Sequence, residues 1–310
     1  MSPEKMNKNL PSHSQSYCME ARAAGETAFL ELTRRQSGQV FGVTSRGIFI
    51  RTEQSGLIFL SFEEFRGPLT VNLAEPFTPF HELQNGQRAS LGENRLQIPA
   101  GHIEVLAAPE AVWRIPPADL THISALRTRL ESGFNLARMV NVDKKNAGLG
   151  VLIQALLVNP GELDADLPLW SEALRLRQAL QERDVTAALA SLSAFLGCGR
   201  GLTPSGDDFA IGVLLALNRW GFSLWEDAWR SNLNEKVILA ARQKTTTLSA
   251  GLIDCAATGQ ADERLIGALD YLYTGQGDTA GLAAAISGWG SSSGIDALAG
   301  MTVVVLSSAQ

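Results

Sequence analysis

The sequence predicts an α+β protein, in which an antiparallel β-rich domain of barrel or sandwich type precedes a mainly α-helical domain. Strand-like runs recur at intervals of roughly 8–12 residues as far as Trp113, which is typical of small β-domains. After Pro116-Pro117 the apolar residues recur at spacings of three and four, which indicates amphipathic helices. The alternation of strands and helices that a doubly wound sheet needs is missing. We expect a flexible arm over residues 1–20, the β-rich domain over 21–116 and the helical domain over 117–310.

The β-rich segment is divided by turn residues. Ser45-Arg46-Gly47 predicts a turn between two strands, and Gly92-Glu93-Asn94 predicts another. The strand-like runs between such turns are residues 39–52, 56–62, 68–73, 88–99 and 102–108.

The helical segment begins with a clear amphipathic pattern. Leu120, Ile123, Leu126, Leu130 and Phe134 fall on one face of a helix predicted within residues 117–140. Further helices are predicted near residues 149–158, 168–182, 184–196, 206–220, 223–240, 246–258, 262–273, 279–287 and 294–307.

Charge excludes several classes of partner. The chain has 26 Lys and Arg against 32 Asp and Glu, and no run of more than two basic residues. It therefore lacks the basic stripe of nucleic-acid-binding proteins and the polybasic segment of membrane anchors. No uncharged apolar run reaches the length of a membrane span, and residues 1–18 contain no apolar stretch of a secretory signal. We expect a cytoplasmic protein without a nucleic-acid or membrane partner.

Cysteine and histidine give no metal site. Cys18, Cys198 and Cys255 cannot all pair, and none lies in a C-x-x-C motif, so reduced thiols are expected. The four histidines are scattered, without H-E-x-x-H or Cys/His ligand spacing. No cofactor is predicted, and Mg²⁺ is the only ion left open.

Glycine is the most informative residue type. Two windows, residues 197–212 and 288–300, hold nine of the 29 glycines. Such concentration predicts backbone with positive φ or very close packing. Both windows contain the pattern S-G-x-D-x-x-x-G, at Ser205–Gly212 and at Ser293–Gly300, and each is expected to open a helix.

Two interpretations of this repeated pattern stay open. In the first, Ser205 with Asp208, and Ser293 with Asp296, form capping boxes that only stabilise the helix starts. In the second, the two helix N-termini converge and offer unpaired N–H groups and partial positive charge to a carboxylate or phosphate.

The second interpretation assigns residues to a site. If Asp208 is engaged in its own cap, Asp207 is the spare carboxylate, and we predict it to be the catalytic residue, which holds an amide nitrogen, a proton or Mg²⁺. Arg200 would supply positive charge. The predicted ligand-binding residues are Arg200, Thr203, Ser205, Gly206, Asp208, Ser292, Ser293, Gly294 and Asp296.

A third polar segment, Lys244–Gly251, also predicts a helix start. Its threonines and serine could donate to the same site. The favoured interpretation is a threonine N-cap followed by a helix with small residues on its packing face.

The two loops carry a resemblance to a known family. The strings Leu202–Asp208 and Ser292–Gly300, together with Gly67–Leu73 in the β-rich part, resemble the AllH-like family, long catalogued as a domain of unknown function. The chain departs from the family pattern at Cys198 and Arg200. The resemblance implies a β-rich N-terminal part followed by a helical part with both loops.

The resemblance also implies a function. Members of this family are associated with ureide (allantoin) degradation and purine nitrogen catabolism, as one subunit of a hetero-oligomeric oxamate carbamoyltransferase. That reaction moves a carbamoyl group between oxalurate and phosphate, and it gives oxamate and carbamoyl phosphate. Partners implied are a small carboxylate or phosphate ligand and the other protein subunits.

Three functions are compatible with the sequence. The first is a carbamoyltransferase subunit that binds a small anion between the loops. The second is a non-catalytic scaffold or regulatory subunit, in which the loops only cap helices. The third is a stand-alone phosphotransferase or hydrolase that uses Asp207 and Asp208 with Mg²⁺.

Overall fold

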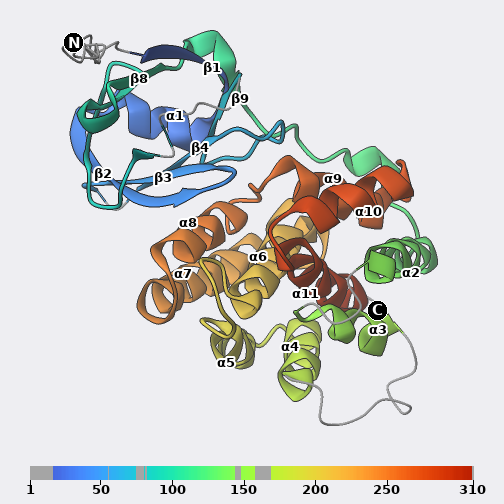
Figure 1. The fold of residues 1–310 in the computed structure, drawn as a ribbon. Coiled ribbons are helices and arrows are strands. Elements are labelled where there is room, and N and C mark those ends of the chain that lie inside the picture. Colours follow the sequence, from blue (N-terminus) through green and yellow to red (C-terminus); the bar gives the residue numbers. More distant parts are fainter. Residues whose placement is uncertain are drawn as a thin grey trace, which may run out of the picture. The chain divides into compact units, whose positions relative to one another are not determined.

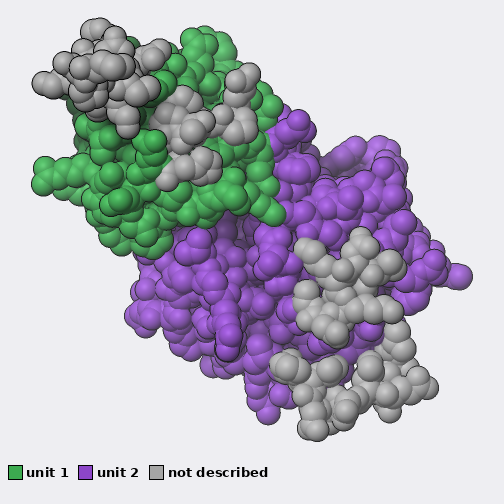
Figure 2. Space-filling view, viewed as in Figure 1, with its two compact units in different colours: residues 1–24, 28–63, 71–112 green, residues 25–27, 64–70, 113–310 purple. Residues whose placement is uncertain are grey.

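The structure, a computed structural model, describes residues 17–54, 56–74, 80, 82–143, 148–157 and 169–308, without the side chains of 141–143. Its chain divides into two compact units (Figures 1 and 2). The described residues within 1–24, 28–63 and 71–112 form unit 1, and those within 25–27, 64–70 and 113–310 form unit 2. Of the arm expected over residues 1–20, residues 1–16 lie outside the described residues, whereas Tyr17–Glu20 belong to the first strand.

Unit 1 is built on a closed β-barrel, so the α+β prediction is confirmed and the barrel is the correct alternative. The eight strands follow the order β5-β4-β3-β2-β6-β7-β8-β1, and a further β5–β1 pairing closes the ring. The β1–β8 pair is parallel, unlike the antiparallel pairs that the turn residues predict. The strands are β1 (Tyr17–Gly25), β2 (Gln36–Thr44), β3 (Gly47–Thr52), β4 (Leu57–Ser61), β5 (Thr70–Leu73), β6 (Arg88–Gly92), β7 (Arg95–Ile98), β8 (Ile103–Leu106) and the short β9 (Val112–Trp113).

The barrel encloses an apolar core that includes the helix α1 (Glu26–Thr33), which the sequence pattern missed. Leu32 of α1 is fully buried with Ile50 and Ile58 of neighbouring strands. Alternating burial along β7 places Leu96 and Ile98 inside and leaves the polar residues between them outside.

Each predicted helical stretch of unit 2 corresponds to an observed helix. These are α2 (Leu126–Asp143), α3 (Gly150–Leu157), α4 (Trp170–Glu182), α5 (Val185–Phe195), α6 (Ser205–Arg219), α7 (Asp227–Lys244), α8 (Thr247–Ala256), α9 (Glu263–Thr274), α10 (Thr279–Gly288) and α11 (Ser293–Ser307). The first begins later than its apolar pattern predicts. Leu120 lies in a short 3-10 turn that Asp119 caps, and Leu120 and Ile123 are exposed. The Ser124 amide donates to the carbonyl of Tyr273 in α9, so the chain between this turn and α2 is bonded to α9 and does not continue as a helix.

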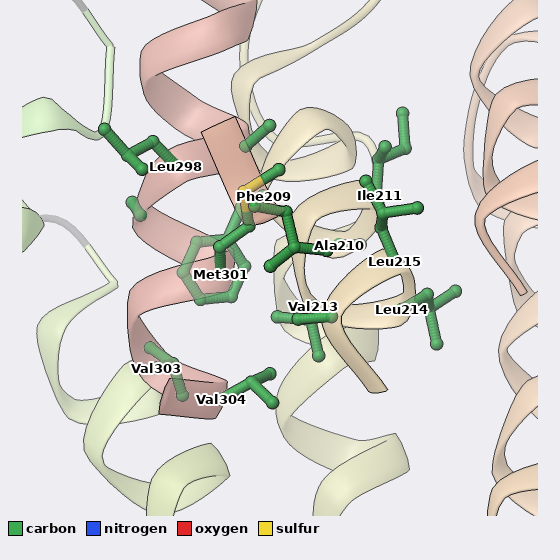
Figure 3. Packing of buried hydrophobic residues seen from close by; sticks show 14 of the residues in the cluster. Phe209, Ala210, Ile211, Val213, Leu214, Leu215, Leu298, Met301, Val303 and Val304 are labelled. Atoms are coloured by element: carbon green, nitrogen blue, oxygen red, sulfur yellow. The ribbon is translucent and has the colours of Figure 1, made fainter. Parts of the chain in front are cut away.

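Helices α6 and α11 pack side by side at the centre of unit 2 (Figure 1). Every residue of α11 is buried, and Figure 3 shows Phe209, Val213, Leu298 and Met301 in the apolar cluster around the two helices. Glycines permit the close approach. A Cβ on Gly212 would stand 1.9 Å from the carbonyl oxygen of Ala297, and a Cβ on Gly300 would stand 2.0 Å from that of Phe209.

These two contacts are related by an internal repeat. Ala297 follows Phe209 by the same interval as Gly300 follows Gly212, so each helix presents its glycine to the equivalent residue of the other. The preceding hairpins repeat as well. The Gly206 amide donates to the carbonyl of Cys198 after α5, as the Gly294 amide donates to that of Trp289 after α10. Unit 2 therefore contains a duplicated helix–loop–helix, α5–α6 and α10–α11.

Among the described helices, none alone combines the length and the apolarity that crossing a membrane requires. Helices α10 and α11 reach that length and composition only together, across a bend of 120°.

Substituting a crossing glycine is expected to destabilise the fold. Gly212→Ala and Gly300→Ala should each lower the free energy of unfolding by about 2–3 kcal/mol, because the added methyl meets a backbone oxygen that cannot move aside. Urea denaturation measures this. The control is Gly288→Ala in α10, where a Cβ would meet open space and no loss is expected. Unfolding midpoints of the two crossing variants equal to wild type would contradict this account.

Candidate functional site

The two glycine-rich loops meet in space. The hydroxyl oxygens of Thr203, in the α5–α6 loop, and Ser293, at the start of α11, lie 3.2 Å apart and share a hydrogen bond. Helices α6 and α11 are in contact at Gly212 and Gly300, about two turns after their first residues. Their N-termini therefore lie close together. The convergence that the second interpretation requires is therefore present.

The loop backbone has the conformation that the glycine concentration predicts. Gly197, Gly199 and Gly201 have φ values of +79°, +126° and +97°, in the region that side chains disfavour. A Cβ on Gly199 would also stand 2.6 Å from the Ser205 amide nitrogen. In the second loop, Gly290 has φ +65°. The prediction of positive φ and close packing is confirmed.

Few of the first-turn amides remain free. Besides the Gly206 and Gly294 amides, those of Asp207 and Ile295 are satisfied, by the carbonyls of Pro204 and Ser292 at 2.9 Å. Within the described part of the chain, the amides of Ser205 and Ser293 have no hydrogen-bond partner. The site therefore offers one free amide per helix, at equivalent positions of the repeat.

Neither predicted capping box forms. Pro204 and Ser292 occupy the N-cap positions without a side-chain cap, and Ser205 and Ser293 are the first helical residues. The loop carbonyls already accept the amides that a capping hydroxyl would satisfy. The serines act across the junction instead. Burial raises the pKa of Asp208 on the opposite helix, and the Ser293 hydroxyl beside it opposes that rise.

Asp208 is buried without a hydrogen-bond partner. Its exposure is 0%, and neither carboxyl oxygen has a partner with the distance and angle of a hydrogen bond. Its pKa is raised to about 8, mainly by burial and in smaller part by the nearby carboxyls of Asp296 and Asp207. The Ser293 and Thr203 hydroxyls lie close enough to oppose this rise. Asp208 is therefore mainly a neutral acid at pH 7.

Asp296 occupies the equivalent position on α11, but its environment differs. Its Oδ1 accepts a hydrogen bond from the amide of Leu149, just before α3, and its Oδ2 has no partner. Burial raises the pKa of Asp296, and the Leu149 amide and the Ser205 and Ser292 hydroxyls oppose the rise. The two carboxyls thus share a position in the repeat but not a hydrogen-bond pattern.

Asp207 is not a spare carboxylate, which corrects the sequence interpretation. Its Oδ1 accepts from the Gly197 amide at 2.8 Å, and its Oδ2 accepts from the Thr245 hydroxyl. Both oxygens are therefore occupied in holding the α5–α6 loop to the start of α8. The sequence interpretation assumed that Asp208 is engaged in a capping box and that Asp207 is unpaired. In the structure Asp207 is hydrogen-bonded, and the oxygens of Asp208 have no partner with hydrogen-bond geometry.

In the segment Lys244–Gly251 a threonine caps a helix, as the favoured interpretation predicts, and the same threonine also contacts the glycine-rich loop. Thr246 is the N-cap of α8 and accepts from the Ser249 amide at 3.1 Å. Its hydroxyl also donates to the Leu202 carbonyl at 2.7 Å. Together with Thr245 it holds the glycine-rich loop, a role that no local sequence pattern signals.

The remaining predicted residues lie on or beneath the loops. Arg200 is exposed, and it forms no ion pair with any residue that the structure describes. Ser292 is half-buried at the N-cap of α11. Gly206 and Gly294 face the carbonyl oxygens of Phe195 and Ile286, from which an added Cβ would stand 2.0 Å.

Two cavities of unit 2 lie apart from these residues. One, of about 330 Å³, is lined by residues that include Trp113, Arg114 and Arg219. The other, of about 400 Å³, lies between α2, α3 and α11 at Leu130, Phe134 and Leu157. No predicted site residue lines either one.

The acidic residues do not form a metal centre in the described part of the chain. No group of three or more His, Cys, Asp or Glu side chains that could hold a metal ion is found there. Asp207, the carboxylate to which the sequence analysis assigned Mg²⁺, accepts hydrogen bonds from the Gly197 amide and the Thr245 hydroxyl.

The fold and the junction define an α+β protein whose helical unit carries a duplicated helix–loop–helix with two buried carboxyls at its centre. Residues 195–305, from the end of α5 into α11, match the family model described as oxamate carbamoyltransferase subunit AllH. The resemblance to the AllH family is confirmed over this range, which contains both loops. No curated protein and no solved structure gave a significant match.

The raised pKa of Asp208 predicts a pH dependence of stability. Above about pH 4 the folded chain keeps a proton that the unfolded chain has released, so stability falls as the pH rises, until Asp208 ionises near pH 8. The slope from this group is about 1.4 kcal/mol per pH unit. Asp208→Asn stays neutral and lacks this contribution.

Urea denaturation between pH 5 and 9 tests this. The stability of Asp208→Asn relative to wild type should increase up to about pH 8 and then level off. Asp296 is present in both proteins, so its own contribution largely cancels. Parallel pH profiles would show that Asp208 is ionised in the folded protein.

Proposed function

We propose that this chain is a subunit of a carbamoyltransferase-type complex and that it binds a small carboxylate or phosphate anion at the junction of α6 and α11. The observation that carries the proposal is the convergence of two helix N-termini that each keep one free amide, at Ser205 and Ser293. Helix N-termini attract anions through their amides and their partial positive charge. The family match over residues 195–305 supports the reaction class.

The electrostatics of the junction are compatible with an anion. Ionised carboxylates beside the free amides would repel a negative ligand. Burial raises the pKa of Asp208 to about 8 and also raises that of Asp296. The oxygens of Asp207 accept hydrogen bonds from Gly197 and Thr245. The exposed Arg200 can add positive charge and a bidentate contact to a carboxylate or phosphate.

The predicted residues then divide by role. The Thr203, Ser205, Ser292 and Ser293 hydroxyls and the two free amides would donate to the anion and to charge that develops during group transfer. Gly206 and Gly294 let the loops approach the preceding helices closely. Asp207, predicted as catalytic, would act by fixing the loop through Gly197 and Thr245.

The biological setting is proposed on the same resemblance. A complex of this class moves a carbamoyl group between oxalurate and phosphate in cytoplasmic ureide and purine nitrogen catabolism. The chain would contribute one anion site to a hetero-oligomer, and the other subunits would complete the catalytic centre.

The scaffold alternative takes a different form from the one that the sequence predicts. Ser205 and Ser293 cap neither helix with their side chains, and the loops cap the helices through their backbone carbonyls instead. A stand-alone Mg²⁺ enzyme is disfavoured because both oxygens of Asp207 are already bound.

Isothermal titration of the chain, alone and in its complex, with inorganic phosphate and with oxamate tests the site. Ser293→Ala removes a hydroxyl beside a free amide and should weaken binding about tenfold, the effect of one hydrogen bond to a charged group. Ser193→Ala in α5 is the matched control and should bind as wild type does. Wild-type affinity in Ser293→Ala would remove the site assignment. Failure of the wild-type complex to bind either anion would favour the scaffold.

A further inference from the structure

The carboxyl of Asp208 is not explained by anion binding alone. Eight buried side-chain polar atoms in the described part of the chain have no hydrogen-bond partner, and three of them are oxygens of Asp208 and Asp296. Unpartnered buried polar atoms are rare in native proteins, and each one calls for a cause. These three lie together at the start of α6 and α11, next to the glycine-rich loops, whereas the other five belong to five residues of other elements.

The repeat shows which carboxyl is available. Asp208 and Asp296 occupy equivalent positions, but the Leu149 amide takes Oδ1 of Asp296. Asp207 has both oxygens occupied, by Gly197 and Thr245. Asp208 is thus the carboxyl of this junction in which neither oxygen has a partner with hydrogen-bond geometry, although the hydroxyls of Ser293 and Thr203 lie beside it.

We propose that Asp208 is the specificity-determining residue of the site, and that it recognises the primary amide, or carbamoyl, end of a ligand whose anionic end binds the free amides of Ser205 and Ser293. This inference rests on the anion site of the proposed function. It adds a second chemical requirement to the ligand, which must carry an –NH₂ group next to a carbonyl.

The chemistry of the two groups is complementary. A carboxylic acid and a primary amide pair through two hydrogen bonds in a planar ring. The acid O–H donates to the amide carbonyl, and the amide N–H donates to the acid carbonyl. A methyl group in place of –NH₂ can make neither the donation nor the ring. The protonated state that burial favours for Asp208 is the state that this pairing needs.

The geometry suits a ligand of this size. Asp208 follows Ser205 by three residues, which corresponds to about 4.5 Å along a helix axis. The hydroxyls of Thr203 and Ser293, which bond each other at 3.2 Å, lie beside Asp208, and the loop over residues 197–202 is exposed. Asp208 itself is fully buried, so the proposal requires that Thr203 and Ser293 move apart when the ligand binds.

The test compares carbamoyl phosphate with acetyl phosphate, which differ by –NH₂ against –CH₃ at the same position. Isothermal titration of the wild-type complex should give at least tenfold tighter binding of carbamoyl phosphate. In Asp208→Leu, of similar size and unable to form hydrogen bonds, the two affinities should fall within about threefold, through loss of carbamoyl phosphate affinity. Binding of inorganic phosphate should be retained.

Two further variants separate recognition from folding. Asp208→Asn carries an amide that forms the same two-bond ring with a primary amide, so it should keep a preference for carbamoyl phosphate. Ser249→Ala removes another buried hydroxyl without a partner, in α8, and should keep the wild-type preference.

The outcomes are distinguishable. If inorganic phosphate binds and Asp208→Leu discriminates as wild type does, the role of Asp208 is overturned and the anion site stands. If wild type shows no preference between the two phosphates, the recognition of an amide is overturned. If the wild-type complex binds none of the three ligands, the anion site and this inference fail together.

Discussion

The close crossing of α6 and α11 is the constraint on which the rest of unit 2 depends. At Gly212 and at Gly300 a single methyl group would collide with a carbonyl oxygen of the other helix. Because the helices approach at these points, their first turns lie together, and Ser293 reaches Asp208 across the junction. The buried carboxyls and the paired loops therefore follow from backbone packing, and the apolar cluster of Figure 3 supplies the energy that holds the helices there.

The duplicated helix–loop–helix makes the two halves of the junction similar, but the two loops differ in length and in their charged residues. The first loop is longer than the second, and it carries the exposed Arg200. Asp207 holds this loop through Thr245, whereas the equivalent residue on α11 is the apolar Ile295. A site with two different halves suits a ligand with two different ends.

Much of this architecture could be predicted from the sequence, and the misses have a physical pattern. Apolar periodicity and turn residues report local burial, so they located the strands from β2 to β8 and the helices of unit 2, but not β1. Partners across the fold leave no local signal. The parallel pairing of Tyr17 with Ile103, and the α1 helix that contributes to the apolar core of unit 1, were therefore missed. The S-x-x-D spacing is equally compatible with a cap and with a contact across the junction, and the choice depends on loop carbonyls that only the fold places.

Energetics favour a functional origin for the junction. Leaving a buried polar group without a partner costs about 1–3 kcal/mol, which is a substantial part of the stability of a typical domain. An asparagine or a leucine at position 208 would remove the charge problem without changing the glycine contacts that set the crossing. A carboxyl in this place therefore contributes nothing to packing that a neutral residue could not. Departures from local stability rules are expected at functional sites, and in this chain the departure coincides with the two free amides and the glycine-built loop.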